Sequence, residues 1–566
     1  MNRRLLLGSA TLALFAALAN PQRAAPAPAP SPAASQGVSI SDSEREPLFD
    51  GLGNLHHPVS TKSFLAQRYF DQGLTLVYAF NHEEAVHSFN EAARRDPSLA
   101  MAYWGIALAL GPNINQPEDT DRGKNAYAAI TKAKSLEANA SAPEREYIDA
   151  LAKRYAPDGK TDPALDTAYA NAMRDVAHRN PDDPDAGTLF AESMMDLHPW
   201  GLWTLDGKPV DGTEEIVATL EGVMAKHPDH IGANHYYIHA VEASPNPGRA
   251  LASAQRLTKL APAAGHLVHM PSHIYFRTGD YHASAETNLR AVKVDRAYLR
   301  ERAGGFYPMM YTSHNIQFLW ASYMMEGNRR GAGKASRELS DQVTLDMVRQ
   351  MPAAEFMMPT RYFTEARFGD WDAILKEPPP PADLGYTNGI WHYARGLAYA
   401  ANRQTDAALK EKSALDRIIA ATPPDRLVGF NSMKQLLTLA STTLGGQIAS
   451  AQGHHDHAIK QLKDAVAIQD SLKYEEPPSW YYPVRETLGM ELLADGKTSD
   501  AEQVFRDDLK INPENGRSLN GLAMCLRMRN ANDEAHKVED RFKKAWAHAD
   551  VKLPTPALSE KTAASR

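Results

Sequence analysis

A fixed spacing between small residues and a proline recurs along this chain and constrains its fold more than any other feature. In the clearest copies, a second small residue follows the first after 12 positions, and a proline follows after 24. Two copies align without gaps: Gly73, Ala85 and Pro97 in one, and Gly489, Ala501 and Pro513 in the other. Small residues at a helix crossing let two antiparallel helices approach closely, and proline is well tolerated where the next helix starts. The spacing therefore predicts helix-turn-helix units.

The same offset of 12 residues marks further units, and at least eight fit along the chain. Their paired positions are Ile238 and Ala250, Ser272 and Ser284, Gly396 and Ala408, Gly446 and Ala458, and Ala523 and Ala535. Units of this kind bury their apolar faces only by stacking on one another, which winds the chain into a superhelix. We therefore expect an all-α, right-handed superhelical solenoid of stacked helix-turn-helix repeats, arranged in two arrays.

This unit resembles the tetratricopeptide repeat (TPR), which is about 34 residues long. From about residue 50 to 545, the chain also resembles a group of exported bacterial TPR proteins, through stretches such as "FNHEEAVHSFNEAARRDP", "NHYYIHAVEAS" and "GHLVHMPSHIYFRTGDY". The first stretch resembles the generic repeat, whereas the two histidine-rich stretches are more specific to the group. The resemblance implies a TPR-type solenoid and an exported location, and it implies no settled reaction.

The two ends of the chain differ in composition from the repeats. A short basic stretch, an apolar run over 5–16 and a small-x-small pattern at 17–19 (Ala-Leu-Ala) are typical of a secretory signal peptide, which we place at residues 1–19. The apolar run is shorter than the roughly 20 residues of a membrane span, so we expect no span after cleavage; retention as an anchor is the alternative. We expect a bacterial periplasmic or secreted protein, with a Pro/Ala-rich disordered linker over 20–45 and a disordered tail over 551–566.

The repeats between these ends divide into two predicted arrays. An N-terminal TPR-like array with the histidine-rich groove covers residues 46–330, an irregular helical junction covers 331–385, and a C-terminal TPR array covers 386–550. The aromatic stretch "YEEPPSWYYPVRETLG" precedes one C-terminal unit. A buried plug between repeats and a peptide-binding surface are its two interpretations.

Charge and cysteine content exclude several classes of site. The chain carries a formal net charge of −8 at pH 7 and no basic cluster, so we expect no nucleic-acid partner. Its single cysteine, Cys525, excludes an intrachain disulfide and a cluster of thiolate ligands. Any transition-metal site must therefore use histidine, aspartate, glutamate or methionine.

Two histidine pairs repeat at the length of one unit. His235 and His239 in "NHYYIHAVE" are followed 34 residues later by His269 and His273 in "GHLVHMPSH". In proteins with this repeat, ligand-contacting side chains lie mainly at the second, fifth, ninth, twelfth and thirteenth positions of a unit, along a concave groove. The register places both pairs at the fifth and ninth positions, and His266 at the second. Packed helices lie about 8–10 Å apart, so we expect these histidines to meet over the groove.

The same register assigns further groove positions and leaves other histidines outside. The predicted ligand-contacting residues of the groove are His314, Gln317, Phe276, Arg277 and Glu192. Three neighbouring histidines, His227, His230 and His282, do not fit groove positions. We interpret these three as solvated or capping residues.

The histidine-rich positions favour a metal site. Imidazole suits zinc, copper, iron and nickel, and carboxylates can complete a mixed shell. The predicted ligands of a zinc or copper site are His235, His239, His266, His269, His273 and Glu242. Glu242 is alternatively a general base, and the excess of histidines allows either a pair of metals or one metal with further histidines behind its ligands. The competing interpretation is a polar groove in which the histidines donate hydrogen bonds to Tyr236, Tyr275 or backbone groups.

Two functions from different classes remain open at this point. The first is a binding solenoid whose groove holds a peptide, a small molecule or a partner protein, with a histidine-rich metal site. The second is a metal-dependent enzyme, an oxidase or a hydrolase, that uses the same histidine and glutamate residues. The sequence "HYYIH" lacks the glutamate of a zinc-protease helix, and a solenoid fold alone does not imply catalysis.

Overall fold

A computed structural model describes residues 46–117, 119–302 and 305–553. The predicted signal peptide, the linker up to residue 45 and the tail from residue 554 onward lie outside the described residues. Contacts divide the chain into two compact units. Within the described residues, the first unit is 46–50 with 54–199, and the second is 51–53 with 200–553.

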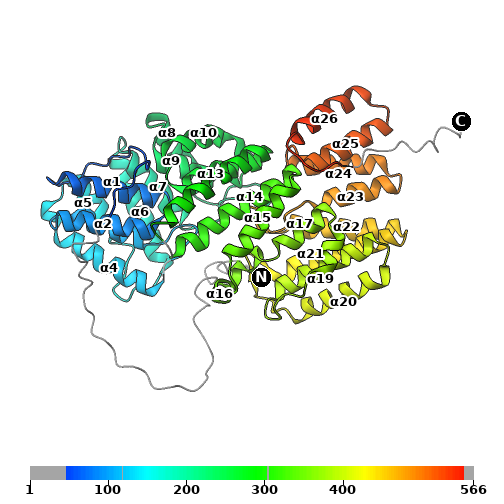
Figure 1. The fold of residues 1–566 in the computed structure, drawn as a ribbon. Coiled ribbons are helices and arrows are strands. Elements are labelled where there is room, and N and C mark those ends of the chain that lie inside the picture. The colour runs from blue at the N-terminus through cyan, green and yellow to red at the C-terminus, as the bar shows by residue number, and fades with distance from the viewer. Residues whose placement is uncertain (1–45, 118, 303–304, 554–566) are drawn as a thin grey trace, which may run out of the picture. The chain divides into compact units, whose positions relative to one another are not determined.

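The first unit consists of helices that pair in sequence order (Figure 1). Its elements are α1 (Phe64–Tyr78), α2 (His82–Arg95), α3 (Ala100–Leu110), α4 (Thr120–Ser135), η2 (Glu137–Asn139), α5 (Ala142–Leu151), α6 (Pro163–Arg179) and α7 (Pro184–Met195). α1 packs against α2, α3 against α4, and α6 against α7. A Cβ on Gly73 of α1 or Gly105 of α3 would lie 2.7 or 2.5 Å from the buried Phe89 ring, so these helices approach closely because both residues are glycine.

The second unit continues as helix pairs to the end of the described chain. Its first elements are α8 (Thr213–Lys226), α9 (Ile231–Glu242), η3 (Pro247–Ala250), α10 (Leu251–Leu260), α11 (Gly265–His269), α12 (Pro271–Thr278), α13 (Tyr281–Leu299), η4 (Pro308–Thr312), α14 (Ser313–Glu326), α15 (Arg329–Gln342), α16 (Leu345–Gln350), η5 (Pro352–Met357), α17 (Thr360–Phe368) and α18 (Trp371–Lys376). Its later helices are α19 (Gly385–Ala401), α20 (Thr405–Ala421), α21 (Met433–Ala451), α22 (His455–Asp470), α23 (Val484–Ala494), α24 (Thr498–Ile511), α25 (Gly516–Met528) and α26 (Asn532–Ala545).

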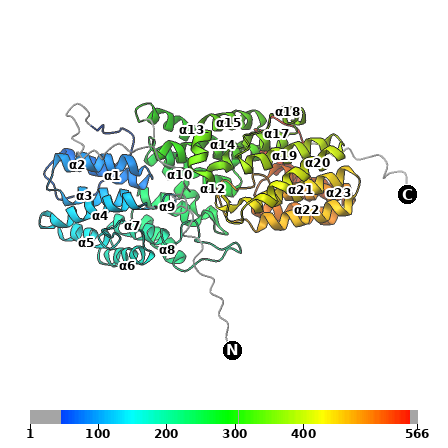
Figure 2. The ribbon, with the colours of Figure 1, turned by 90° about the horizontal axis from the view of Figure 1, so that it is seen from below.

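Consecutive helices of the second unit form stacked hairpins. α19 packs against α20, α21 against α22, α23 against α24, and α25 against α26, while α20 meets α21 and α22 meets α23. Figures 1 and 2 show α19 to α23 packed side by side in one array, with α19 in contact with both α20 and α21. The one sheet among the described residues is a two-stranded antiparallel pair, β1 (Leu427–Val428) and β2 (Asn431–Ser432). The predicted all-α, TPR-type fold is confirmed.

One repeat departs from the predicted continuous helix. α11 ends at His269 and α12 begins at Pro271, because proline lacks the backbone N–H that a helix interior needs. Met270 lies between the two, and its carbonyl still accepts a hydrogen bond from the His273 N–H (3.2 Å). Three predicted ligands therefore lie on two short, nearly consecutive helices rather than on one.

The last helices of the second unit contact its earlier helices. A Cβ on Gly327, which has a φ of +80° after α14, would lie 2.4 Å from the Trp546 ring that follows α26. Arg367 of α17 forms a buried ion pair with Glu486 of α23 (2.5 Å). The C-terminal repeats therefore close onto α14 and α17 within this unit.

The segment between α22 and α23, residues 471–483, lies inside the second unit. Its Trp480 and Tyr481 side chains are buried. Gln317 of α14 donates a hydrogen bond to the Tyr481 hydroxyl (2.8 Å). The structure therefore favours the interpretation of this stretch as a buried plug over its interpretation as a peptide-binding surface.

The division between the units falls between Pro199 and Trp200. The predicted junction over 331–385 lies within the second unit, because α15 packs against α14 and α17, and α17 packs against α19. The proline run over 378–381 occupies the loop between α18 and α19 without interrupting this packing.

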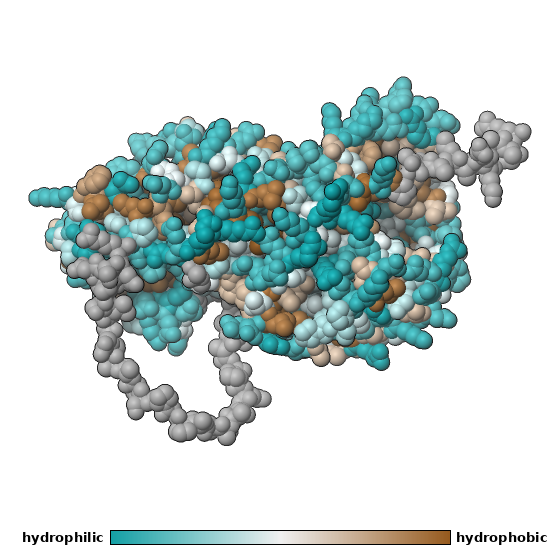
Figure 3. Space-filling model, viewed as in Figure 1, coloured by the Kyte–Doolittle hydropathy of each residue, from teal (hydrophilic) through white to brown (hydrophobic). Residues whose placement is uncertain are grey.

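The visible surface of the protein is mostly hydrophilic, with separate hydrophobic patches (Figure 3). Phe64 and Leu205 are among the few large hydrophobic side chains that are exposed. None of the described helices is both long enough and apolar enough to span a membrane.

Replacing Gly489 of α23 by alanine is expected to destabilise the second unit by about 1–3 kcal/mol. The added Cβ would lie 2.4 Å from the buried Phe505 ring, which outweighs the roughly 1 kcal/mol that alanine gains over glycine in a helix. Chemical denaturation followed by circular dichroism measures the difference. Gly222→Ala in α8 is the matched control, because nothing lies within 4 Å of its added Cβ. Equal effects of the two substitutions would contradict a close helix crossing at Gly489.

Candidate metal centre

Six histidines from four helices meet in the second unit and form what we call the histidine cluster. They are His235 and His239 of α9, His266 and His269 of α11, His273 of α12, and His314 of α14. The first five are buried, and neighbouring rings have centroids 4.7 to 6.2 Å apart. The structure thus brings together all five histidines predicted as ligands, and it adds one predicted only for the groove.

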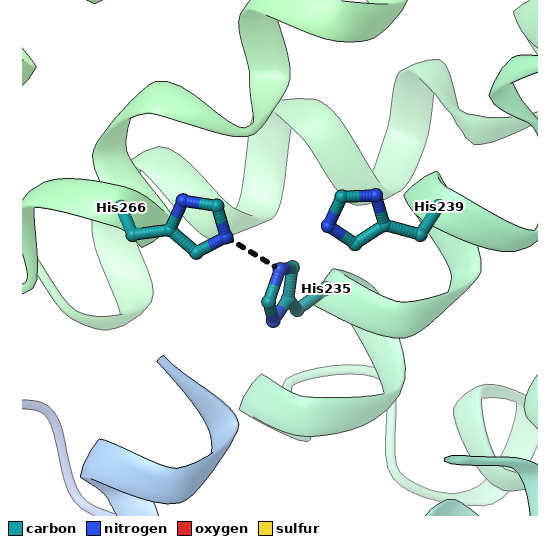
Figure 4. Close-up of side chains that lie close together, drawn as sticks. All are labelled: His235, His239 and His266. Carbon is teal, nitrogen blue, oxygen red and sulfur yellow. Dashed lines mark hydrogen bonds between the residues drawn. The ribbon is translucent and has the colours of Figure 1, made fainter. Parts of the chain in front are cut away.

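The first triad of the cluster consists of His235, His239 and His266. One nitrogen of each ring lies within 4.8 Å of the others, and Figure 4 shows the three rings gathered around a shared space. The Nε2 atoms of His235 and His266 are 3.1 Å apart. His235 and His266 are 31 residues apart, and they meet because α9 and α11 are equivalent helices of successive repeats.

The second triad consists of His269, His273 and His314. Its ligand atoms also lie within 4.8 Å of one another. The Nε2 atoms of His269 and His273 are 2.8 Å apart, and the His314 ring lies 4.7 Å from that of His269. The two triads adjoin, because the rings of His239 and His273 are 5.6 Å apart.

The distances within each triad are close to those of metal ligands. Zn–N bonds are about 2.0–2.1 Å long, so two nitrogen ligands of a tetrahedral zinc ion lie about 3.3 Å apart. The close Nε2 pairs, at 3.1 and 2.8 Å, need only small adjustments to share an ion. Hydrogen bonding between neutral imidazoles, one donating and one accepting, is the alternative for each pair.

Glu242, predicted as a ligand or general base, lies behind the histidines and not among the ligand atoms. Its Oε1 accepts a hydrogen bond from Nδ1 of His239 (2.7 Å), and its Oε2 accepts one from Nδ1 of His273 (2.5 Å). Both carboxylate oxygens are therefore engaged by rings. A carboxylate that accepts from Nδ1 fixes the tautomer whose Nε2 can bind a metal. Glu242 thus orients one histidine of each triad.

Neighbouring polar groups also fix α11 and its histidines. The side-chain oxygen of Asn288, in α13, lies 2.6 Å from Nδ1 of His269. The Nε2 atom of the His269 ring therefore faces His273. The Tyr307 hydroxyl accepts from the His266 backbone N–H (3.0 Å). Gly265 begins this helix, where a Cβ would collide with the carboxylate of Asp295. These contacts hold the start of α11 in one position.

Burial keeps most of the cluster in the form that binds metals. Burial and the charges of neighbouring histidines hold the pKa values of His266 and His269 well below the ordinary range. Burial, with the charge of His273, lowers the pKa of His314 to about 3. Burial also lowers the pKa of His239, against the raising effect of Glu242. These imidazoles are therefore neutral at pH 7, as metal ligands must be.

His273 and Glu242 form the charged pair of the cluster. Burial lowers the pKa of His273, but the charge and hydrogen bond of Glu242 raise it above its ordinary value. Burial raises the pKa of Glu242, but His273 and His239 lower it to about 2. The cluster thus holds one permanent negative charge among rings that are mostly neutral.

Aromatic residues from distant parts of the second unit cover the cluster. Trp200 contacts the His239 ring edge-on at 5.6 Å, and the Phe430 ring lies 5.8 Å from Trp200. Tyr474 reaches the cluster from the plug, with its hydroxyl 3.4 Å from Oε2 of Glu242. Side chains of the chain itself therefore close the site.

Glu476 is a second acid beside the cluster, and sequence reasoning missed it. Its Oε1 accepts a hydrogen bond from Tyr474 (2.5 Å), and Arg277 lies 3.9 Å from the same oxygen. Burial raises the pKa of Glu476 to about 7, with Arg277 lowering it and Glu242 raising it. Within the described residues, its buried Oε2 has no hydrogen-bond partner. The two adjacent glutamates in "YEEPP" can be seen in the sequence, but no local pattern indicates that they lie near the histidines.

Three residues predicted to contact a groove ligand contact the protein instead. Phe276 packs against Phe318 and Tyr281 in the hydrophobic core. Gln317 is buried and bonded to the plug. Arg277 donates to the backbone carbonyl of Glu242 (2.9 Å). The folded-back C-terminal repeats and the plug occupy the space that an open groove would leave.

Glu192, the last predicted groove residue, lies in the first unit. It is buried beside Asp196, which pairs with Arg154 at 2.6 Å. Burial and the charge of Asp196 raise the pKa of Glu192 well above its ordinary value. The structure therefore places Glu192 in a buried acid pair of α7 rather than in the histidine cluster.

The first unit contains another group with metal-ligand spacing, formed by His57, Asp183 and Asp185. Here the polar atoms bond to one another and to tyrosines. Nδ1 of His57 lies 2.7 Å from Asp185, and the hydroxyls of Tyr78 and Tyr147 donate to Asp185 and Asp183. These bonds tie the segment before α1 to the start of α7, which is a structural role.

Comparison with known proteins gives no family for this chain. No protein-family model matches it, and no curated protein matches its sequence. Among solved structures, it is similar to a human IFIT1 dimer with PPP-AAAA, at 14% identity over 86% of this chain and 92% of that chain, with a TM-score of 0.32. It is also similar to yeast Tom70, at 11% identity over 88% of this chain and 92% of that chain, with a TM-score of 0.28. Such low scores carry no argument, so the helix hairpins described above define the fold.

Glu242→Gln is expected to lower the pKa of His273 in the metal-free protein by about 1 or more, because it removes the negative charge that favours the imidazolium. Histidine NMR titration measures this shift. Glu286→Gln is the control, since Glu286 is an exposed residue of α13. An unchanged titration of His273 in the Glu242 variant would contradict the pairing.

The same pair predicts a pH window for stability. The folded-state pKa of His273 is raised, so its stabilisation is fully present below the unfolded value of about 6.5 and is lost as the pH rises through the folded value. The pKa of Glu242 is lowered, so its stabilisation is present above about pH 4.5 and is lost as the pH falls through the folded value. Glu242→Gln should therefore cost most stability between about pH 4.5 and 6.5.

Proposed function

We propose that the histidine cluster is a transition-metal centre that binds two zinc or copper ions, one in each triad. The observation that supports it most is the arrangement of six histidines as two triads whose ligand atoms lie within 4.8 Å, with Glu242 oriented toward both. Neutral imidazoles without thiolates suit zinc and copper. Three histidines also leave a coordination position open on each ion, as in catalytic zinc sites.

Several features favour a metal over the hydrogen-bonded alternative. Hydrogen bonds between imidazoles satisfy the close pairs, but they do not explain why six rings gather in one buried place. The low pKa values of His266, His269 and His314 mean that protonation there is unfavourable, whereas binding of a metal needs the neutral ring. Glu242 supplies a buried negative charge that offsets part of the charge of the ions.

The ligand of the site is a small molecule or an ion rather than a peptide. Phe276 and Gln317, which would line an open groove, are covered by the protein itself. Trp200 and Tyr474 leave little room for a macromolecule at the cluster. The location we propose is periplasmic or secreted, on the strength of the signal-like residues 1–19.

Titration of the metal-free protein with zinc and with copper, by calorimetry against a competing chelator, tests the centre. His239→Ala and His273→Ala should each remove one tightly bound ion, because each removes a ligand of a different triad. His454→Ala is the control, since His454 is exposed in a turn, and it should keep every ion. The absence of stoichiometric binding in the wild type, or full binding in both folded cluster variants, would overturn the proposal.

Glu242→Gln should weaken metal binding by about 10–100-fold while leaving the number of ions unchanged. The reason is that Glu242 orients ligands without being one. The same chelator competition gives the affinity. Loss of a whole ion would instead make Glu242 a direct ligand.

A second candidate function, a metal-dependent hydrolase or oxidase, is favoured by Glu476. This buried carboxyl has a pKa near 7 and an oxygen without a hydrogen-bond partner in the described chain. A group that titrates near the working pH is suited to give or take a proton, while the metal would supply a polarised water or a redox centre. Tyr474 and Arg277 hold Glu476 in place.

Glu476→Gln should lower any turnover by about 10²–10⁴-fold without changing metal content. The zinc-loaded protein is screened on ester, phosphoester and amide substrates, and the copper-loaded protein on phenols. Glu411→Gln serves as the control, because Glu411 pairs with His392 and Arg395 elsewhere in the unit. A loaded, folded protein without turnover on any of these classes would leave metal binding as the function.

A further inference from the structure

The segment after α26 is docked on the turn between α14 and α15. The Asp550 carboxylate accepts hydrogen bonds from the backbone N–H groups of Arg329 (2.7 Å) and Arg330 (3.1 Å). The Asp550 N–H donates to the Gly327 carbonyl (3.2 Å). These contacts, together with Trp546 against Gly327, hold residues 546–550 across the end of α14.

This docking brings three side chains with metal-ligand chemistry together at the end of α14. The rings of His282 and His548 stack face to face, with centroids 3.5 Å apart and an interplanar angle of 4°. Nδ1 of His282 lies 2.7 Å from Oε1 of Glu326. One ligand atom from each residue lies within 4.8 Å of the other two. We call these three residues the C-terminal clasp.

The carboxylate of the clasp is only partly satisfied by the protein, because His282 engages its Oε1. Glu326 is buried, and its Oε2 makes no hydrogen bond of ordinary geometry within the described chain. A buried carboxylate oxygen without a partner is costly and is normally paired with a donor or a cation.

The two imidazoles provide ligands that a cation at this place would need. Nδ1 of His282 and Oε1 of Glu326 are 2.7 Å apart, so they need to separate by only about 0.6 Å to share a zinc ion in place of the proton between them. Glu326 is also the last residue of α14, where the negative end of the helix dipole favours a cation.

We propose that His282, Glu326 and His548 bind a zinc ion that fastens the C-terminal end of the second unit to α13 and α14. Two histidines and one glutamate are a recurrent zinc ligand set, and a water completes the shell. In the structure the two rings are stacked, so the exposed His548 ring would have to rotate out of the stack for one of its nitrogens to reach the ion. The site is separate from the histidine cluster, because the two share no residue.

A zinc ion in the clasp would tie two distant parts of the chain together, which a solvated stack of two histidines would not do. His282 and His548 are 266 residues apart in sequence, and they come from the two sides of the contact between early and late repeats. An ion held by both therefore restrains the end of the solenoid. Without the ion, the segment keeps the contacts of Asp550 and Trp546 but loses this restraint.

The test measures zinc bound by the full-length, metal-free protein at about 10 μM free zinc, together with hydrogen exchange of residues 546–553. His548→Ala and Glu326→Gln should each bind one zinc fewer than the wild type. Zinc should slow exchange of this segment by about tenfold or more in the wild type and have no effect on it in the two variants. His536→Ala is the matched control, because His536 is an exposed histidine of α26, and it should behave as the wild type.

The outcome is independent of the histidine cluster. If the cluster holds two zinc ions, the count falls from three to two in the clasp variants; if it holds none, the count falls from one to zero. Equal zinc counts in the wild type, His548→Ala and Glu326→Gln would overturn the clasp. So would an exchange rate of residues 546–553 that zinc does not change in the wild type.

Discussion

The carboxylate of Glu242 lies between imidazole rings from two successive repeats, and the geometry of the histidine cluster depends on it. Its oxygens bind Nδ1 of His239 and of His273 at 2.7 and 2.5 Å. A buried carboxylate needs such partners to compensate for lost water, and each ring in turn has its Nε2 directed into the cluster. The bond to His273 also connects α9 to α12, so the site and the packing of these repeats share one interaction.

The repeat fold and the meeting of the histidines could both be predicted from the sequence, because both follow from local spacing. Gly73 and Gly489 lie where helices cross, and Phe89 and Phe505 fill the space that a larger residue would need. A separation of one repeat length places equivalent side chains on neighbouring helices, which brought His239 and His273 together.

The rest of the site could not be predicted, because long-range folding decides it. Rules for groove positions assume an open concave face, whereas here the plug covers Gln317 and the core buries Phe276. Tyr474 and Glu476 reach the cluster from more than 200 residues away in sequence. Glu242 was placed correctly near the histidines, but only the structure shows that its two oxygens face Nδ1 atoms.

The contact of the late repeats with the early ones changes how the second unit responds to stress. In an open solenoid each repeat touches only its neighbours, so the ends fray first and unfolding spreads inward. Here Trp546 rests against Gly327, and Arg367 is paired with Glu486, so the last repeats have partners beyond their neighbours in sequence. Within the described residues, unravelling of the last repeat would therefore also have to break contacts with α14 and α17, which couples the late repeats of the second unit to its early ones.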